Sequence, residues 1–364
     1  MKHLRFVSNL ALALLCTTRS EAGVTIINWT SVSGTVAYNG YLPRSASDWV
    51  YGTVTMFESG KEFAGIEYAT GNGIFAPTPT TIQWNAVTPM NGEVGHATSV
   101  ALAAADKYDA AIEVHQGGQD GGAQLWYSLG SGKLGGTLSE QIPPTIKWAA
   151  SQSYDTGFNP SVAVDNSNYL SNPINTTVVE VHQAASGSSQ LYYHWGLLLG
   201  INTSSPSMLW GPATKIPSVS GYAPSVTISD NLVIVAYQGS SGEMFYVLGQ
   251  NGGISGITWG SPVYYTQGYN PSISVYGCSG CTGWTVLEAH QGQNSTGALW
   301  YRTGAISKQG KPVLIWTPDG DTQYDTGCYP SIAQNGVYVW ETHEYSCGDV
   351  APVLSSFGQL VYYH

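Results

Sequence analysis

Short apolar runs recur along the whole chain, and none of them is long. The runs at 100–105 and 232–237, for example, have the length of a buried strand and fall short of a helix. Clusters of glycine, asparagine and proline separate them. No run keeps a helical period over the length that a helix needs. The pattern therefore predicts an all-β protein of many short strands joined by tight turns.

The runs belong to a repeat that is clearest at 146–196 and 257–304. In both segments an Ile-x-Trp run is followed by a run around Asn-Pro-Ser, then by Glu-x-His-Gln, and last by Leu with two aromatic residues. Looser copies lie at 82–127, 209–246 and 315–362, and the most degenerate copy covers 27–68. One tryptophan marks each unit: Trp29, Trp84, Trp148, Trp210, Trp259 and Trp316.

This spacing predicts a six-bladed β-propeller with four-stranded blades. The chain starts on the Ile-x-Trp strand and stops on the Leu-Val-Tyr strand. We therefore expect 26–29 to pair with 360–363 and to close the ring, which removes open sheet edges. A pair of sandwiches or a linear solenoid is the alternative, and a solenoid would need atypical capping repeats.

Residues 1–22 have the pattern of a secretory signal. Lys2 and Arg5 precede a short apolar stretch at 7–16, and Ser20-Glu21-Ala22 offers a cleavage site. An uncleaved anchor is the alternative, but the apolar stretch is too short to span a bilayer. We expect a secreted protein with a single domain at 23–364 and no membrane insertion.

The formal net charge is −11, and only 10% of the residues are charged. Phosphate backbones and anionic lipid surfaces repel such a chain. Nucleic acid is therefore excluded as a partner, and we expect a monomer.

Four cysteines follow the predicted signal, an even number that is typical of disulfides in a secreted chain. Cys278 with Cys281 could close a small loop, and Cys328 with Cys347 could staple the last repeat. Four cysteines allow three pairings, and the sequence does not choose between them. The C-x-x-C spacing also fits redox or zinc chemistry, but no second such pair accompanies it. We expect no metal and no cofactor. Sequons at Asn28, Asn175, Asn202 and Asn294 would allow glycosylation.

Four units carry Glu-x-His on the same predicted strand. Residues two apart share one face of a strand, so each pair lies side by side where two blades meet. One interpretation is structural, with hydrogen bonds to the Pro-Ser hydroxyl or to backbone of the next blade. The other is a repeated ligand site, in which these polar groups and an aromatic ring bind a sugar. The candidate ligand-binding residues are Glu113, His115, Gln116, Trp126, Glu180, His182, Gln183, Tyr192, Glu288, His290, Gln291, Trp300, Arg302, Glu341 and His343.

Catalysis is disfavoured by the repetition itself. A general acid and base need one asymmetric constellation with pKa values pushed apart. The same pair instead recurs around the predicted ring, and Val235 with Tyr237 replaces it in one unit.

The units resemble a repeat of secreted bacterial and fungal propeller proteins. The resemblance rests on Tyr154-Asp-Thr-Gly-Phe-Asn-Pro-Ser-Val-Ala163, Val178-Val-Glu-Val-His-Gln183 and Leu299-Trp-Tyr301, and it covers 82–364 well. In outline the chain also resembles the six-bladed fungal fucose-binding lectins, which use an arginine, a glutamate and a tryptophan in each pocket between blades. Only Arg302 lies near such an arginine position, so fucose specificity does not carry over.

We expect a secreted, multivalent, non-catalytic, lectin-like propeller whose partners are glycans. A glycoside hydrolase or polysaccharide lyase with one site at the central channel is the first alternative. It predicts two or more carboxylates converging there. A protein-binding scaffold or toxin component is the second alternative, and it predicts one exposed apolar patch.

Overall fold

The fold is seen in a computed structural model that describes residues 24–30, 38–47, 52–59, 64–75, 79–105, 108–117, 122–132, 145–167, 174–185, 188–277, 282–293, 297–318, 320–336, 338–347 and 351–362. The predicted signal 1–22 and the pair Cys278 and Cys281 lie outside these ranges. The described residues are mostly strand, with a short 3-10 helix at Gly253–Ser255. Within them, no helix has the length and apolar character needed to cross a membrane.

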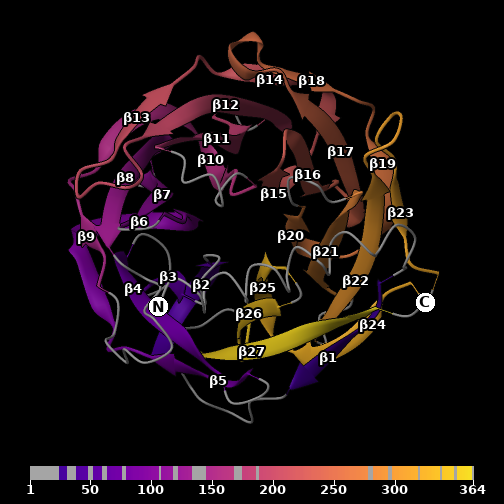
Figure 1. Ribbon diagram of the computed structural model, residues 1–364, viewed down its shortest axis with the longest axis horizontal. Coiled ribbons are helices and arrows are strands. Elements are labelled where there is room, and N and C mark those ends of the chain that lie inside the picture. Colours follow the sequence, from indigo (N-terminus) through magenta and orange to yellow (C-terminus); the bar gives the residue numbers. More distant parts are fainter. Residues whose placement is uncertain are drawn as a thin grey trace, which may run out of the picture.

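Antiparallel sheets are arranged around a central space, as in a β-propeller (Figure 1). The strands nearest the centre are β2 (Tyr38–Ser47), β6 (Thr88–Ala103), β10 (Gln152–Val164), β15 (Tyr222–Ser229), β20 (Tyr269–Tyr276) and β25 (Cys328–Asn335). Each pairs with a second strand, namely β3 (Gly52–Glu58), β7 (Asp109–Gly117), β11 (Asn175–Ala184), β16 (Leu232–Gln238), β21 (Gly283–Gln291) or β26 (Tyr338–Glu344).

The third and outer strands complete each sheet, which we call a blade. The third strands are β4 (Ala64–Phe75), β8 (Gln124–Gly132), β12 (Gln190–Leu199), β17 (Glu243–Asn251), β22 (Ala298–Ser307) and β27 (Ala351–Tyr362). The outer edge is formed by β1 (Val24–Thr30), β5 (Pro79–Trp84), β9 (Lys147–Trp148), β13 (Ser207–Trp210), β14 (Thr214–Ser220), β18 (Ile257–Trp259), β19 (Val263–Gln267), β23 (Leu314–Trp316) and β24 (Thr322–Thr326). The long strands β6 and β10 run from the outer edge of one blade to the inner edge of the next.

The two ends of the chain share one blade. Strand β1 pairs antiparallel with β27, and Ile27 lies opposite Leu360. The beginning of β2 also pairs with β27, so that Tyr38 lies opposite Val353. The first described residues therefore form the outer edge of a blade whose other strands come from the end of the chain (Figure 1).

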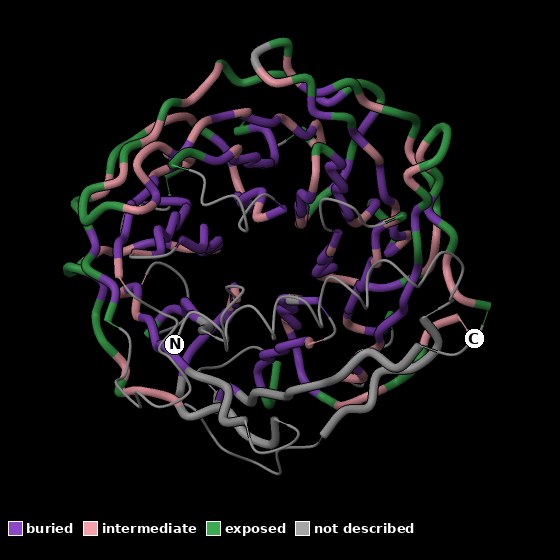
Figure 2. The backbone as a smooth tube through the Cα atoms, viewed as in Figure 1, coloured by how far each residue is buried: buried purple, intermediate pink, exposed green. Residues whose placement is uncertain are grey.

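The hydrophobic core lies between neighbouring blades. In one cluster Val179 and Val181 of β11 pack with Val233 and Val235 of β16, and similar clusters lie between the other neighbours. The inner and middle strands are largely buried, and exposed residues gather at the periphery (Figure 2). Because both faces of a middle strand are covered, its apolar run is continuous rather than alternating.

The tryptophans that mark the repeat hold adjacent blades together. Four of them stand on outer strands and meet, edge to face, a tyrosine on the third strand of the preceding blade. The centroid distance is 5.8 Å for Tyr127 and Trp210, and 5.4 Å for Tyr193 and Trp259. Tyr68 with Trp148 and Tyr246 with Trp316 form the same contact.

Every inner strand begins with a β-bulge around one residue in the left-handed conformation. The residues are Leu42, Ala97, Asn159, Ala223, Asn270 and Tyr329, with φ between 45° and 53°. Most of them precede a proline, as in Asn159-Pro160 and Asn270-Pro271. Such a conformation costs free energy in a residue with a Cβ and persists only where the surroundings enforce it.

Serine hydroxyls after these bulges link neighbouring inner strands. Ser99 Oγ accepts from Val162 N at 3.1 Å, and Ser161 Oγ accepts from Val226 N at 3.1 Å. Three more links of the same kind join neighbouring inner strands: Ile273 N to Ser225 Oγ, Ile332 N to Ser272 Oγ and Ser45 N to Ser331 Oγ. An inner strand is a sheet edge, so these N–H groups have no neighbouring strand to bond to. The Pro-Ser pair thus satisfies the edge of the next blade.

We predict that Ser161→Ala destabilises the fold because it removes the acceptor for the Val226 N–H. The expected loss is about 1 kcal/mol in the free energy of unfolding, measured by urea denaturation. Ser241→Ala, at an exposed turn, is the matched control and should stay within about 0.5 kcal/mol of the parent. Equal effects of the two substitutions would contradict the linking role.

Candidate functional site

A cavity of about 280 Å³ lies where the inner strands begin, at one end of the central channel. Its wall comes from β2, β6, β10, β15, β20 and β25. The lining includes Asn159, Pro160, Ala223, Pro224, Asn270 and Pro271, together with the linking serines. These residues are small or uncharged. Most of the ring therefore offers backbone and hydroxyl groups rather than reactive side chains.

One side of this cavity departs from the repeat. Tyr41 and Arg44 of β2, His96 of β6 and Tyr329 of β25 line it together. Arg44 pairs with Met56 of the second strand, and Ser99 pairs with Val114 in the equivalent position of another blade. Arg44 therefore stands where the other blades have a serine. The first repeat departs from the common sequence, and two of the residues that differ, Tyr41 and Arg44, supply functional groups here.

Two glutamates stand behind this side of the wall, and both replace a glutamine of the repeat. Glu58 lies opposite Tyr41, and Glu344 lies opposite Cys328. The corresponding residues in the other blades are Gln116, Gln183, Gln238 and Gln291. All six positions end a second strand beside the bulge.

Both carboxylates bond to the backbone of the next blade. Glu344 Oε1 accepts from Leu42 N at 2.5 Å, and Glu58 Oε1 accepts from Ala97 N at 3.0 Å. Gln238 makes the same kind of bond to Asn270 N, at 3.4 Å. A glutamine would satisfy this N–H equally well. The glutamates therefore keep the structural bond and add a group that can carry charge and exchange a proton.

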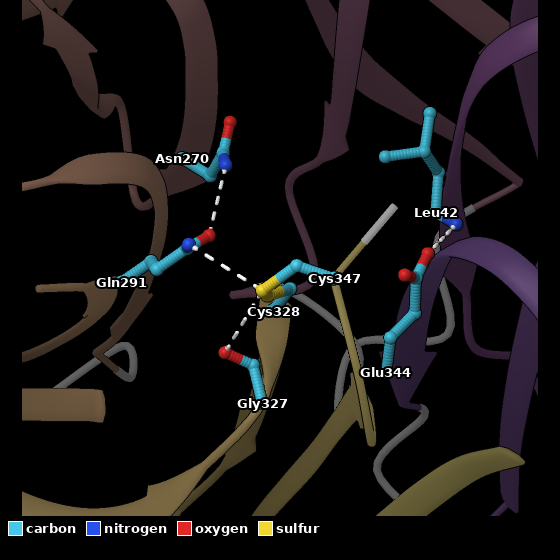
Figure 3. Close-up of a disulfide and its surroundings, with 7 residues drawn as sticks. All are labelled: Leu42, Asn270, Gln291, Gly327, Cys328, Glu344 and Cys347. Atoms are coloured by element: carbon cyan, nitrogen blue, oxygen red, sulfur yellow. Dashed lines mark hydrogen bonds between the residues drawn. A yellow bond between two sulfur atoms is a disulfide. The ribbon is translucent and has the colours of Figure 1, made fainter. Parts of the chain in front are cut away.

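Glu344 is fully buried, and its Oε2 has no hydrogen-bond partner among the described residues. Burial, and then the nearby charge of Glu58, raise the pKa of Glu344 to about 8, although the Leu42 N–H and Arg44 act in the opposite direction. Figure 3 shows the carboxyl group directed toward the Leu42 amide. At neutral pH this group is therefore a protonated acid held next to the cavity wall.

Aromatic and basic groups surround these acids. The Tyr41 ring stacks on His96 with centroids 6.5 Å apart and meets Tyr329 edge to face at 5.7 Å. His96 Nδ1 lies 3.1 Å from Glu58 Oε1. Burial raises the pKa of the Tyr41 hydroxyl, and the hydrogen bond with Tyr329 adds to this effect. The arrangement combines a proton donor, a carboxylate–imidazole pair and a guanidinium, which is a set suited to acid–base chemistry on a polar substrate.

The predicted disulfide Cys328–Cys347 is present beside this site. The two Cα atoms are 5.4 Å apart, and Cys328 lies opposite Glu344 in the strand pair. The bond ties the start of β25 to the segment that follows Glu344 (Figure 3). It therefore restrains the chain on both sides of the buried acid.

The repeated Glu-x-His pairs lie inside the protein. Glu113, Glu180, Glu288 and Glu341 are 0% exposed, and their histidine partners are at most 2% exposed. In each pair the histidine Nδ1 bonds to the glutamate carboxylate, at 3.0 Å for His115 and His290. The serine hydroxyls expected as partners bond elsewhere, to the backbone of the next inner strand.

Tyrosines from the adjoining blade complete two of these pairs. Tyr265 of β19 donates to Glu288 at 3.0 Å, and Tyr324 of β24 donates to Glu341 at 3.0 Å. Burial raises the pKa of both hydroxyls well above the ordinary value, and the glutamate charge adds to it. The tyrosine, glutamate and histidine form a buried clasp between blades. This geometry favours the structural interpretation, and a ligand-binding role of these residues stays a prediction.

Of the other predicted ligand residues, Gln116, Gln183 and Arg302 are also buried, and the rest are partly accessible but dispersed. Trp126, Tyr192 and Trp300 are half-buried on their third strands, and Tyr192 stacks on His182 at 6.0 Å. Arg302 is bound to Asp321 at 2.6 Å and lies over the Trp316 ring. Gln291 bonds to Asn270 and contacts Cys347.

Six residues of this site are not among those expected from the repeat: Glu58, Glu344, Arg44, Tyr41, His96 and Tyr329. Their departure from the repeat is the feature of the sequence that marks them. For Glu58 and Glu344, a glutamate stands where other units have glutamine.

Comparison with known proteins identifies the fold. No model of a known protein family matches the sequence, and no curated protein is similar to it. Among solved structures, the chain is similar to Trypanosoma rangeli sialidase in complex with sialic acid, with a TM-score of 0.53 and 12% identity over 88% of this chain. A mutant of the same sialidase that displays trans-sialidase activity gives a TM-score of 0.54 at 12% identity over 94% of this chain.

A mutant of AofleA from Arthrobotrys oligospora gives a TM-score of 0.51 at 10% identity, over 96% of this chain and 91% of that one. The chain spans 54% of the sialidase and 57% of the trans-sialidase mutant. At these identities the likeness shows the fold, which is a propeller of the sialidase type.

The prediction of a non-catalytic, lectin-like module is wrong. The solved structures similar to this chain include sialidases, which are enzymes that act on glycans. The repetition of Glu-x-His does not exclude catalysis, because the structure has two acids outside that motif, Glu58 and Glu344.

We predict that the fold loses stability as the pH rises. Because the pKa of Glu344 is raised to about 8, the folded state holds a proton that the unfolded state releases above its ordinary value of 4.5. The unfolding temperature should therefore fall between about pH 5 and about pH 8.5. Glu344→Gln keeps the bond to Leu42 without a titrating proton and should make this fall shallower.

The buried histidines act in the same direction. Burial lowers the pKa of His115, His182, His290 and His343, but the paired glutamates raise it by more. Their contribution is complete below the unfolded pKa of 6.5 and is lost as the pH rises through the raised values. An unfolding temperature that increases over this range would contradict the assignment.

We predict that Cys328→Ser with Cys347→Ser lowers the free energy of unfolding by about 3 kcal/mol, because the bond closes a loop with a sequence separation of 19. Calorimetry of the double variant beside the oxidised parent measures this loss. A double variant as stable as the parent would contradict the stabilising role of the disulfide.

Proposed function

We propose that the protein is a glycoside hydrolase with one active site at the channel mouth, on the side formed by β2, β6, β25 and β26. The observation that supports this function is the buried Glu344, whose pKa is raised to about 8 and which bonds to Leu42 of the cavity lining. Glu58 is a second buried carboxylate, and it bonds to Ala97 of the same lining. Glycosidases use such a pair, with a raised pKa on the acid and ionisation of its partner. Glu344 is 0% exposed, so it would protonate the leaving oxygen only after a bound sugar displaces the residues of the wall in front of it.

The remaining groups would bind and orient the sugar. The Tyr41 and Tyr329 rings supply apolar faces for a pyranose ring, and Arg44 supplies a cation for an acidic substituent. The likeness in fold to Trypanosoma rangeli sialidase in complex with sialic acid agrees with a glycan substrate. Arg44 would favour a sugar that carries a carboxylate.

A polysaccharide lyase is the second candidate, and the pair formed by His96 and Glu58 favours it. In a lyase Arg44 would neutralise a uronate carboxylate, and His96, oriented by Glu58, would remove the adjacent proton. The bond would then break by elimination rather than by addition of water.

Activity assays on the parent and on Glu344→Gln test the proposal. We expect the parent to hydrolyse a glycoside from a panel of nitrophenyl glycosides and polysaccharides that includes sialosides and uronides. Glu344→Gln should lower kcat/KM by about 100-fold or more because it removes the acid. The variant should fold, since glutamine stands in this register in four other blades. For the parent, we also expect activity to fall above about pH 8, where Glu344 loses its proton.

The controls separate this site from the rest of the ring. Glu243→Gln, on strand β17, should keep full activity. Ultraviolet absorbance of an unsaturated product would assign the lyase reaction instead. No turnover of any glycan by the folded parent would refute both enzymes, and unchanged kinetics in Glu344→Gln would refute the proposed acid.

We further propose that the described blades belong to one domain, 23–364, with six blades in a closed ring. The inner strands form one set at the channel, and the pairing of β1 with β27 supports closure through the two ends. Secretion by removal of 1–22 is part of the same proposal. The disulfide Cys328–Cys347 supports it, because such bonds persist in oxidising compartments.

A further inference from the structure

A second cluster of chemical groups lies away from the channel mouth, between two blades. Among the described residues, Asp155, His182 and His194 place one ligand atom each within 4.8 Å of one another. Asp155 Oδ2 is 2.8 Å from His194 Nε2 and 3.6 Å from His182 Nε2. Both histidines are buried, whereas Asp155 is partly exposed, so the cluster is open to solvent on one side.

The other nitrogen of each imidazole is already engaged. His194 Nδ1 lies 2.8 Å from the Gly211 carbonyl, and His182 Nδ1 lies 3.0 Å from Glu180 Oε2. A carbonyl only accepts, so the proton of a neutral His194 is on Nδ1 and its Nε2 presents a lone pair to the carboxylate. Two lone pairs 2.8 Å apart repel unless a cation lies with them. This position therefore requires a proton or a metal ion.

The corresponding place in another blade holds a cation of its own. Arg302 takes the register of His194, since it lies opposite Glu288 as His194 lies opposite Glu180. Its guanidinium binds Asp321 at 2.6 Å, next to His290. Where arginine is replaced by histidine, a positive charge has to come from another source.

We propose that Asp155, His182 and His194 bind a divalent metal ion of the zinc type. Two imidazole nitrogens and a carboxylate oxygen are a ligand set that Zn²⁺ prefers, and three protein ligands leave a position for water. The contacts of Nδ1 to Gly211 and Glu180 fix both rings in the tautomer that a metal needs, which is the usual outer arrangement of zinc histidines. The remaining Asp155 oxygen, Oδ1, is held by the Thr156 N–H at 2.7 Å.

The ion would bridge two blades. Asp155 belongs to the part of β10 that pairs with β8, whereas His182 and His194 stand on β11 and β12 of the next blade. Bound Zn²⁺ would therefore stabilise the junction between these blades. This departs from the expectation of no metal, because His194 and Asp155 lie outside the Glu-x-His motif.

Titration of the full chain with Zn²⁺, after dialysis against a chelator, tests the site. We expect one ion per chain by calorimetry, a rise in the unfolding temperature, and with Co²⁺ the visible absorption of a four-coordinate ion. Asp155→Asn and His194→Arg should abolish all three signals. His194→Arg should keep the fold, because Arg302 occupies this register in another blade, and circular dichroism verifies this.

Asp325→Asn is the matched control. Asp325 occupies the same register and lies 3.8 Å from His343 Nε2, but Ser356 stands opposite Glu341 where His194 would be. This variant should bind Zn²⁺ like the parent, as should Cys278→Ser with Cys281→Ser. Absence of Zn²⁺ binding by the folded parent would overturn the proposal and assign the cation as a proton. Binding that survives in Asp155→Asn or disappears with the cysteines would also overturn it.

Discussion

The free N–H groups of the innermost strands are the constraint on which the rest of this structure depends. Each inner strand is an edge, and a buried edge must bond to something outside its own sheet. Here the partners come from the neighbouring blade, as a serine hydroxyl and as the side-chain oxygen of a glutamine or glutamate. The bulge before each serine aims the hydroxyl, and its left-handed residue is tolerated because these bonds hold it.

This design allows chemistry to arise by small departures from the repeat. A glutamine and a glutamate accept the same N–H bond, so a change between them alters charge without altering the backbone. Glu344 is such a change in a place too buried to ionise easily, and its pKa of about 8 follows from that burial. Arg44 is a second departure, in the register of the linking serine. Both meet at the junction where the last blade joins the first.

The most regular feature of the sequence, Glu-x-His, has the opposite character. Its members are buried and bonded to each other, and in two blades also to a tyrosine of the adjoining blade. Such a group is costly to bury unless it is fully paired, which explains why glutamate, histidine and tyrosine recur together. Where a neighbouring residue differs, as at His194, the side chains can form a set of metal ligands.

The structure selects the disulfide Cys328–Cys347 from the pairings that four cysteines allow. The sequence by itself determined the strand content, the repeat and the pairing partner of the first strand. These follow from local periodicity and from a repeat that shows its own register. The tertiary structure decided which polar residues are accessible, because burial in a propeller depends on the neighbouring blade. It placed Glu58 and Glu344 behind one wall of the cavity, and it placed Asp155 next to His194 of the adjacent blade. Residues so distant along the chain, and unlike their counterparts in the repeat, meet only when the blades pack.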